Sequence, residues 1–80
     1  MTDASRHTYT IVLEPDPEEG GYAVTVPALP GCVTQGETVA ECTANAEEAI
    51  ALYLADLAGS GEPIPEERVR PQLLSVTVAA

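Results

Sequence analysis

Basic residues are almost missing from this chain of 80 residues. It has no Lys and three Arg against thirteen Asp and Glu, so its formal net charge is −10. Proteins that bind nucleic acid directly neutralise its phosphates with Lys and Arg. The composition therefore argues against direct binding of nucleic acid and favours a basic protein partner, because long-range attraction speeds encounter. Solubility alone is the other explanation of the acidity.

Cysteine, histidine and long apolar runs are also scarce. The two cysteines, Cys32 and Cys42, and the single His7 are too few and too scattered for the usual metal-ligand sets. The polar N-terminus MTDASRHTYT has no signal-peptide core, and no apolar run approaches the ~20 residues of a membrane span. We therefore expect a cytoplasmic protein with buried, reduced thiols and with no metal or cofactor. A chain of this size has a small core, and self-association is its expected support.

Alternating apolar residues predict four β-strands. The first two, residues 8–14 and 22–26, are joined by the solvated loop PDPEEGG and indicate a β-hairpin. A third short strand, residues 32–37, follows the Pro-Gly turn PALPG and is more polar, which is typical of a sheet edge. The last strand, LLSVTV at residues 73–78, follows a proline-rich connection over residues 62–71.

A helix of about twenty residues is predicted between the third and fourth strands. Thr38 and Glu41 match a capping box, in which the Thr38 hydroxyl accepts from the Glu41 N–H and the Glu41 carboxylate accepts from the Thr38 N–H. Apolar residues then recur at spacings of three and four as far as Leu57. Gly59 and Gly61 are candidates for the C-terminal cap.

The order β-β-β-α-β predicts one α+β domain over residues 1–80, built in two layers. Three antiparallel strands form a sheet, and one long helix packs on one of its faces. The helix returns the chain to the starting end, so the fourth strand is expected parallel to the first strand and beside it.

The sequence contains no pattern typical of an active site. Neither cysteine has a nearby cation that would lower its thiol pKa. The acidic residues gather in the loop after the first strand rather than at inward strand positions, where a metal-dependent nuclease would hold them. We therefore predict no catalytic, cofactor-binding or metal-binding residues. A partner-binding surface is expected instead at Thr34, Gln35 and Glu37, because a polar edge strand can accept a partner strand.

The run VPALPGCVTQGETVAECTANAEEAIALYLADL, at residues 26–57, resembles the HicB-like antitoxin family. Residues 27–32 match P-x-L-P-G-C, residues 34–38 match T-x-G-[DE]-T and residues 45–50 match N-A-x-E-A-I. The resemblance covers residues 8 to about 58. It implies a reduced ribonuclease-H-like fold. It also implies a protein of a type II toxin–antitoxin system that binds a small basic HicA-type ribonuclease and blocks its access to mRNA.

The resemblance is to a short member of that family. Full antitoxins continue into a C-terminal DNA-binding domain, whereas this sequence reaches only Ala80, so autoregulation by direct DNA binding is not expected. Two alternatives to toxin neutralisation stay open. The chain is a solitary HicB-like regulatory or scaffold module without a toxin, or it is a remnant metal-dependent nuclease on the same fold.

Overall fold

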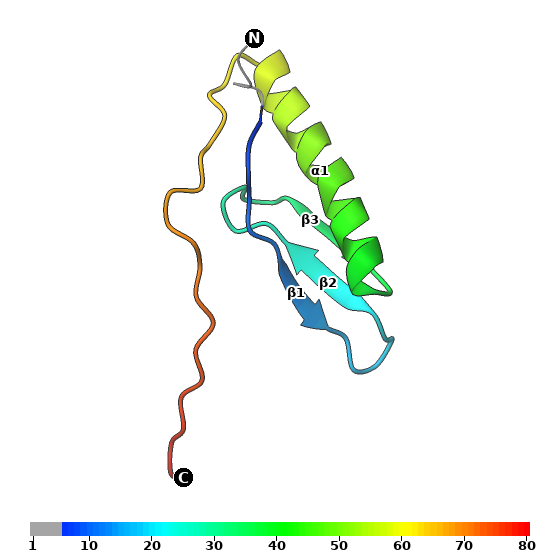
Figure 1. The fold of residues 1–80 in the computed structure, drawn as a ribbon, viewed down its shortest axis with the longest axis vertical. Helices are drawn as coiled ribbons and strands as arrows, with labels where there is room; N and C mark the ends of the chain where they lie inside the picture. Colours follow the sequence, from blue (N-terminus) through cyan, green and yellow to red (C-terminus); the bar gives the residue numbers. More distant parts are fainter. Residues whose placement is uncertain (1–5) are drawn as a thin grey trace.

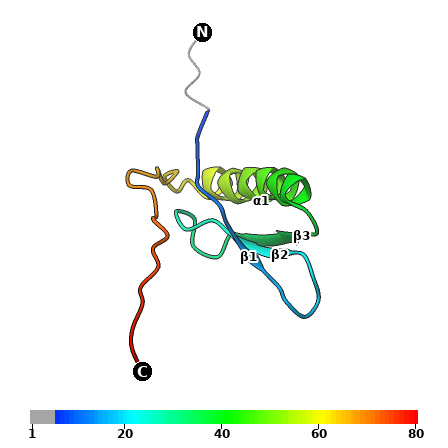
Figure 2. The ribbon, with the colours of Figure 1, turned by 60° about the horizontal axis from the view of Figure 1, so that its bottom comes forward.

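The computed structural model describes residues 6–80. Residues 1–5, which belong to the polar N-terminus considered above, lie outside the described residues. Along the chain the elements are β1 (Val12–Pro15), β2 (Tyr22–Thr25), β3 (Val33–Gly36) and α1 (Val39–Gly59). The sheet has the order β1-β2-β3 with both pairs antiparallel, and α1 lies over one of its faces (Figures 1 and 2). The predicted α+β arrangement of three antiparallel strands and one long helix is thus confirmed.

The loop between β1 and β2 is a structured turn. The Asp16 carboxylate accepts hydrogen bonds from the backbone N–H groups of Glu18 and Glu19, at 3.0 and 3.1 Å, as in an Asx-turn. Gly20 and Gly21 then adopt φ values of 80° and 72°, which residues with a Cβ atom rarely adopt. These local interactions reverse the chain and set the register in which β1 and β2 pair.

The core consists of two small clusters between the sheet and α1. The first joins Val24 of β2 to Cys42 and Ala46 of α1. The second is formed by Val26, Leu29 and Cys32 and is covered by the second half of α1. Burying a Val or Leu side chain contributes about 1.5–3 kcal/mol, so each cluster matters in a domain of this size. Both cysteines are free and buried, as predicted.

The segment between β2 and β3 folds into consecutive turns, which place its apolar side chains in the second core cluster. The Leu29 N–H donates to the Val26 carbonyl at 2.9 Å, and the Cys32 N–H donates to the Leu29 carbonyl at 2.9 Å. The Tyr53 hydroxyl of α1 donates to the Pro30 carbonyl at 2.8 Å. The Pro-Gly turn predicted from the sequence is therefore stabilised by its own backbone hydrogen bonds and by a hydrogen bond from α1.

Helix α1 begins at the predicted capping signal, with one difference. The Thr38 hydroxyl accepts from the Glu41 N–H at 3.1 Å, as predicted. The Glu41 carboxylate accepts from the Glu37 N–H at 2.7 Å and not from the Thr38 N–H, so the return bond reaches one residue further back. At the other end α1 stops at Gly59, and Gly61 has a φ of 72°, in agreement with a glycine-based C-terminal cap.

The predicted fourth strand, residues 73–78, is not part of this sheet. The segment is extended but has no strand partner, and it runs away from the sheet and helix in both views (Figures 1 and 2). Its apolar side chains are exposed, at 78–87% for Leu73, Leu74, Val76 and Val78. We call residues 73–78 the C-terminal segment.

The connection before this segment explains the difference. The Thr10 N–H, which a strand beside the first strand would use, donates instead to the Glu67 carboxylate at 2.6 Å. The Thr10 hydroxyl also donates to Glu67, and the Tyr9 hydroxyl donates to the Pro65 carbonyl. These bonds involve the residues just before β1, which begins at Val12 and is therefore shorter than the predicted range 8–14.

Candidate partner-binding site

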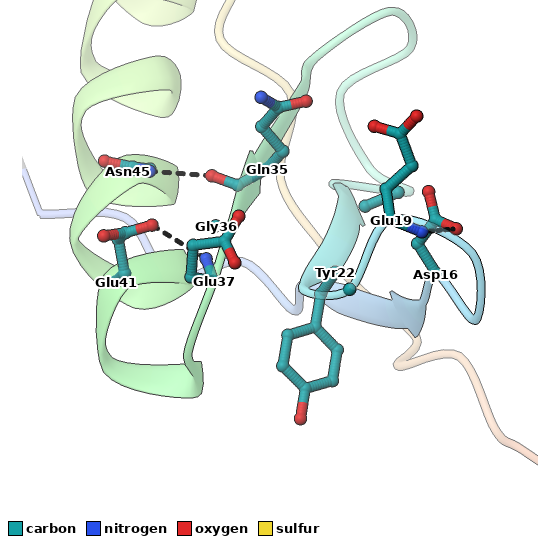
Figure 3. A pocket seen from close by; sticks show the side chains of 10 residues that line it. Asp16, Glu19, Tyr22, Gln35, Gly36, Glu37, Glu41 and Asn45 are labelled. Carbon is teal, nitrogen blue, oxygen red and sulfur yellow. Dashed lines mark hydrogen bonds between the residues drawn. The ribbon is translucent and has the colours of Figure 1, made fainter.

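An acidic pocket of about 240 Å³ opens where the β1–β2 turn, the end of β3 and the first turns of α1 meet (Figure 3). Four carboxylates line it, from Asp16, Glu19, Glu37 and Glu41, and none of its described lining residues is basic. Figure 3 shows Glu37 and Glu41 toward the helix and the other two toward the turn. Carboxylates spread in this way suit a ligand that carries several cationic groups, such as the Arg and Lys side chains of a protein.

The walls of the pocket are held together by a close approach of β3 and α1. A Cβ atom at Gly36 would lie 2.8 Å from the Cys42 backbone nitrogen and 2.9 Å from its Sγ atom, so a larger residue there would force β3 and α1 to shift apart. Beside it, Asn45 Nδ2 donates to the Gln35 carbonyl at 2.7 Å (Figure 3). The helix side of the pocket is therefore fixed relative to the sheet side.

The predicted partner-binding residues lie in different environments. Gln35 and Glu37 are exposed and line the acidic pocket. Thr34 is half-buried, is paired with Val24 of β2 and does not line the pocket. The structure thus brings two of the three residues to one pocket and leaves the third in the sheet.

Sequence reasoning missed three acidic residues of the pocket. Asp16 and Glu19 were interpreted as part of a solvated loop, and Glu41 only as a helix cap. The antiparallel register, in which Tyr22 pairs with Gly36, places the β1–β2 turn beside the end of β3. The signal was therefore the predicted strand order, which puts that turn and the helix start at the same end of the sheet.

Negative charge around the pocket also affects a buried thiol. Burial, and then the neighbouring charges of Glu41 and Glu37, raises the pKa of the Cys42 thiol. Burial likewise raises the pKa of the Cys32 thiol. Both thiols are therefore protonated at neutral pH, and a protonated thiol is a poor nucleophile.

Between residues 6 and 80, no three His, Cys, Asp or Glu side chains are grouped so that they could hold a metal ion. In that part of the chain, α1 also lacks the apolar length that a membrane crossing requires.

Comparison with known proteins identifies the family. A family model described as HicB-like antitoxin of bacterial toxin–antitoxin systems matches residues 9–75. A UPF0150 protein of Thermoplasma acidophilum is 48% identical over 59 residues, which cover 74% of this chain and 84% of that relative. A UPF0150 protein of Synechocystis sp. is 37% identical over 78 residues, which cover 98% of both chains. The chain therefore belongs to the HicB-like antitoxin family, as its motifs predicted.

Proposed function

We propose that this protein is an antitoxin of a type II toxin–antitoxin system that binds and neutralises a small, basic HicA-type mRNA ribonuclease. The observation that carries the proposal is the family match over residues 9–75. The net charge of −10 supports it, because an acidic protein attracts a basic toxin over long range. Family membership favours a non-enzymatic role, and the proposed action is binding alone.

The proposed contact is the acidic pocket together with the neighbouring part of β3. Glu37 and Gln35 would meet the toxin directly, and Thr34 would support the strand from which they project. The carboxylates of the pocket would pair with the same Arg and Lys side chains that a ribonuclease uses to hold RNA phosphates. Such pairing would exclude RNA from the toxin, which is the physical basis of neutralisation in this proposal.

The proposal also covers the setting in which the protein acts. The protein would work in the cytoplasm, where mRNA is found, without contacting nucleic acid itself. It would act as a homo-oligomer, because its core is small and four large apolar side chains of its C-terminal segment are exposed. The reduced ribonuclease-H-like fold implied by the family resemblance is proposed as well, and it requires a fourth strand that the chain's own sheet lacks.

An RNA-cleavage assay tests the proposal. The small basic protein encoded beside this gene is purified, and its cleavage of RNA is followed while the present protein is titrated in. We expect stoichiometric inhibition. The double change Glu19→Lys and Glu37→Lys, both in the acidic pocket, is expected to weaken inhibition at least tenfold, about 1.4 kcal/mol.

The matched control is the double change Glu48→Lys and Asp56→Lys, which alters the net charge equally at exposed positions of α1 outside the pocket. Its inhibition is expected to stay close to that of the wild type. A neighbouring toxin that keeps full activity at every ratio would show that the protein is not its antitoxin. The protein alone, with Mg²⁺ or Mn²⁺, is expected to leave the RNA intact, and cleavage there would favour the nuclease alternative.

A further inference from the structure

The C-terminal segment has the composition of a β-strand that belongs inside a sheet. Leu74, Val76 and Val78 alternate with Ser75 and Thr77, which gives one apolar and one polar face. The β-branched residues favour extended backbone, yet the segment belongs to no strand of the structure. Its apolar face is nevertheless in water, with Val76 83% exposed. Covering that face would be favourable, because apolar burial drives both folding and association.

The chain's own sheet does not receive this segment. Glu67 occupies the backbone N–H of Thr10 through its carboxylate, and the Pro65 carbonyl is held by the Tyr9 hydroxyl. Pro71, two residues before the segment, fixes its own φ and has no N–H to donate. The connection is therefore fastened beside the residues that precede β1, and the chain leads away from the body beyond it (Figure 1).

Beyond the Thr10 N–H that Glu67 occupies, the edge of β1 from Val12 to Pro15 remains available for another strand. In the described part of the chain β1 pairs with β2 alone. At the opposite edge, β3 offers one backbone acceptor fewer, because the Gln35 carbonyl already accepts a hydrogen bond from Asn45 of α1. An unpaired edge strand is a template for an added strand, so β1 is the edge that fits the segment.

A second copy of this chain is the occupant that the observations favour. The segment is part of the shared domain, because the similarity to the Synechocystis relative covers 98% of this chain. Residues 71–80 carry no charged side chain, so the net charge of −10 on each copy does not oppose pairing locally. Arg68 and Arg70, in the connection that leads to the segment, would bring two of the three arginines toward that acidic second copy.

We propose that the C-terminal segment of one copy pairs with β1 of a second copy, and that the second copy returns its own segment to the first. Such a reciprocal exchange closes with two-fold symmetry and covers both segments and both edges at once. The inference rests on the self-association proposed above and specifies which parts of the two copies are in contact. It does not depend on toxin binding.

The mass of the intact protein in solution is the first test. Light scattering coupled to size exclusion is expected to give twice the 8.3 kDa of one chain. Val76→Asp places a charge on the apolar face of the segment and is expected to return the mass to one chain. The control Ser75→Asp adds the same charge at the neighbouring position on the opposite face and is expected to leave the dimer in place.

Neither substitution touches the core of the monomer, since residues 75 and 76 are both exposed, so circular dichroism should report an intact α1 in both. Hydrogen exchange of the wild type then locates the contact, with slow amides expected over the C-terminal segment and β1. A monomer at every concentration overturns both the exchange and the self-association. Val76→Asp could leave the dimer intact, or the amides of the segment could exchange rapidly with solvent. Either result would overturn the proposed strand exchange and leave self-association standing.

Discussion

Gly36 is the residue on which the contact between sheet and helix most depends. It ends β3 and lies against the backbone and Sγ atom of Cys42. This approach buries Cys42 against Val24 and brings the start of α1 to the acidic pocket. A single missing Cβ atom therefore determines both the packing of one core cluster and the shape of the proposed binding site.

We expect Gly36→Ala to lower the free energy of unfolding by about 1–3 kcal/mol, the usual cost of forcing an extra carbon into a packed core. The reason is the 2.8 Å separation between the added Cβ and the Cys42 nitrogen. Urea unfolding followed by circular dichroism measures the change. The control is Gly59→Ala, where the added carbon meets nothing within 4 Å and helix propensity favours Ala by up to about 1 kcal/mol. If Gly36→Ala and the wild type were equally stable, the contact between Gly36 of β3 and Cys42 of α1 would have room for an added carbon.

Glu67 gives the protein a specific dependence on acid. Hydrogen bonds from the Thr10 hydroxyl and backbone N–H lower the pKa of Glu67 below its ordinary value of 4.5, and the charge of Arg70 adds to this. The bonds therefore stabilise the folded protein above the ordinary pKa, and this stabilisation is lost as the pH falls through the lowered pKa. Unfolding midpoints measured from pH 6 downward are expected to fall more steeply below about 4.5 for wild type than for Glu67→Gln. Glu62→Gln, an exposed position on the same connection, should keep the wild-type slope.

At the scale of the elements, the start of α1 is set by one side chain. Thr38 is extended, with φ −129° and ψ 164°, and its hydroxyl accepts from the Glu41 N–H. Asn45, about two turns later, ties the same end of the helix to β3. The helix start and the edge strand therefore behave as one unit.

Thr38→Ala is expected to lower the free energy of unfolding by about 1 kcal/mol, the typical cost of removing an N-cap. Thr38→Ser keeps a hydroxyl in place and should cost much less. Thermal unfolding of the three proteins compares them directly. If Ser and Ala were equally destabilising, the loss would come from the methyl group of Thr38 and not from its hydrogen bond.

The same elements show what the sequence could predict. The hairpin turn, the Thr38 cap and the glycine-rich helix end depend on neighbours within a few residues, and the sequence located each of them. Strand pairing depends on distant residues. The alternation at residues 73–78 predicted a fourth strand that the sheet does not contain, and the bond from Thr10 to Glu67, 57 positions apart, was not readable from local patterns. The predicted partner-binding residues Thr34, Gln35 and Glu37 lie close together along the chain, whereas Asp16 and Glu19 are brought beside two of them only by the register of β2 and β3.

At the scale of the whole molecule, charge dominates how partners approach. Thirteen acidic residues against three arginines give a field that a basic protein senses before contact. The acidic pocket concentrates part of this field at one end of the sheet, among residues from a turn, a strand and a helix. A long-range field of this kind accelerates association more than it strengthens the final complex.

Association with the proposed toxin should therefore slow as salt is added. Raising the salt from about 0.01 to 0.15 M shortens the screening length from about 30 to 8 Å, and we expect the association rate constant to fall at least tenfold while dissociation changes little. Stopped-flow measurements at several salt concentrations separate the two rates. Glu19→Lys with Glu37→Lys should flatten the dependence more than the matched pair at Glu48 and Asp56. An association rate constant that does not change with salt would show that long-range electrostatic attraction does not accelerate binding.

The hydrogen bond from Asn45 to the Gln35 carbonyl has a consequence for how far assembly can proceed. A fibre of stacked sheets grows only when every molecule offers two open sides, one to receive a strand and one to be received. Here a side-chain amide of the helix occupies one carbonyl of the β3 edge. Growth of the sheet through β3 is therefore opposed at this carbonyl, whereas β1 can still accept a strand, and only a reciprocal exchange between two copies satisfies both strands and both edges.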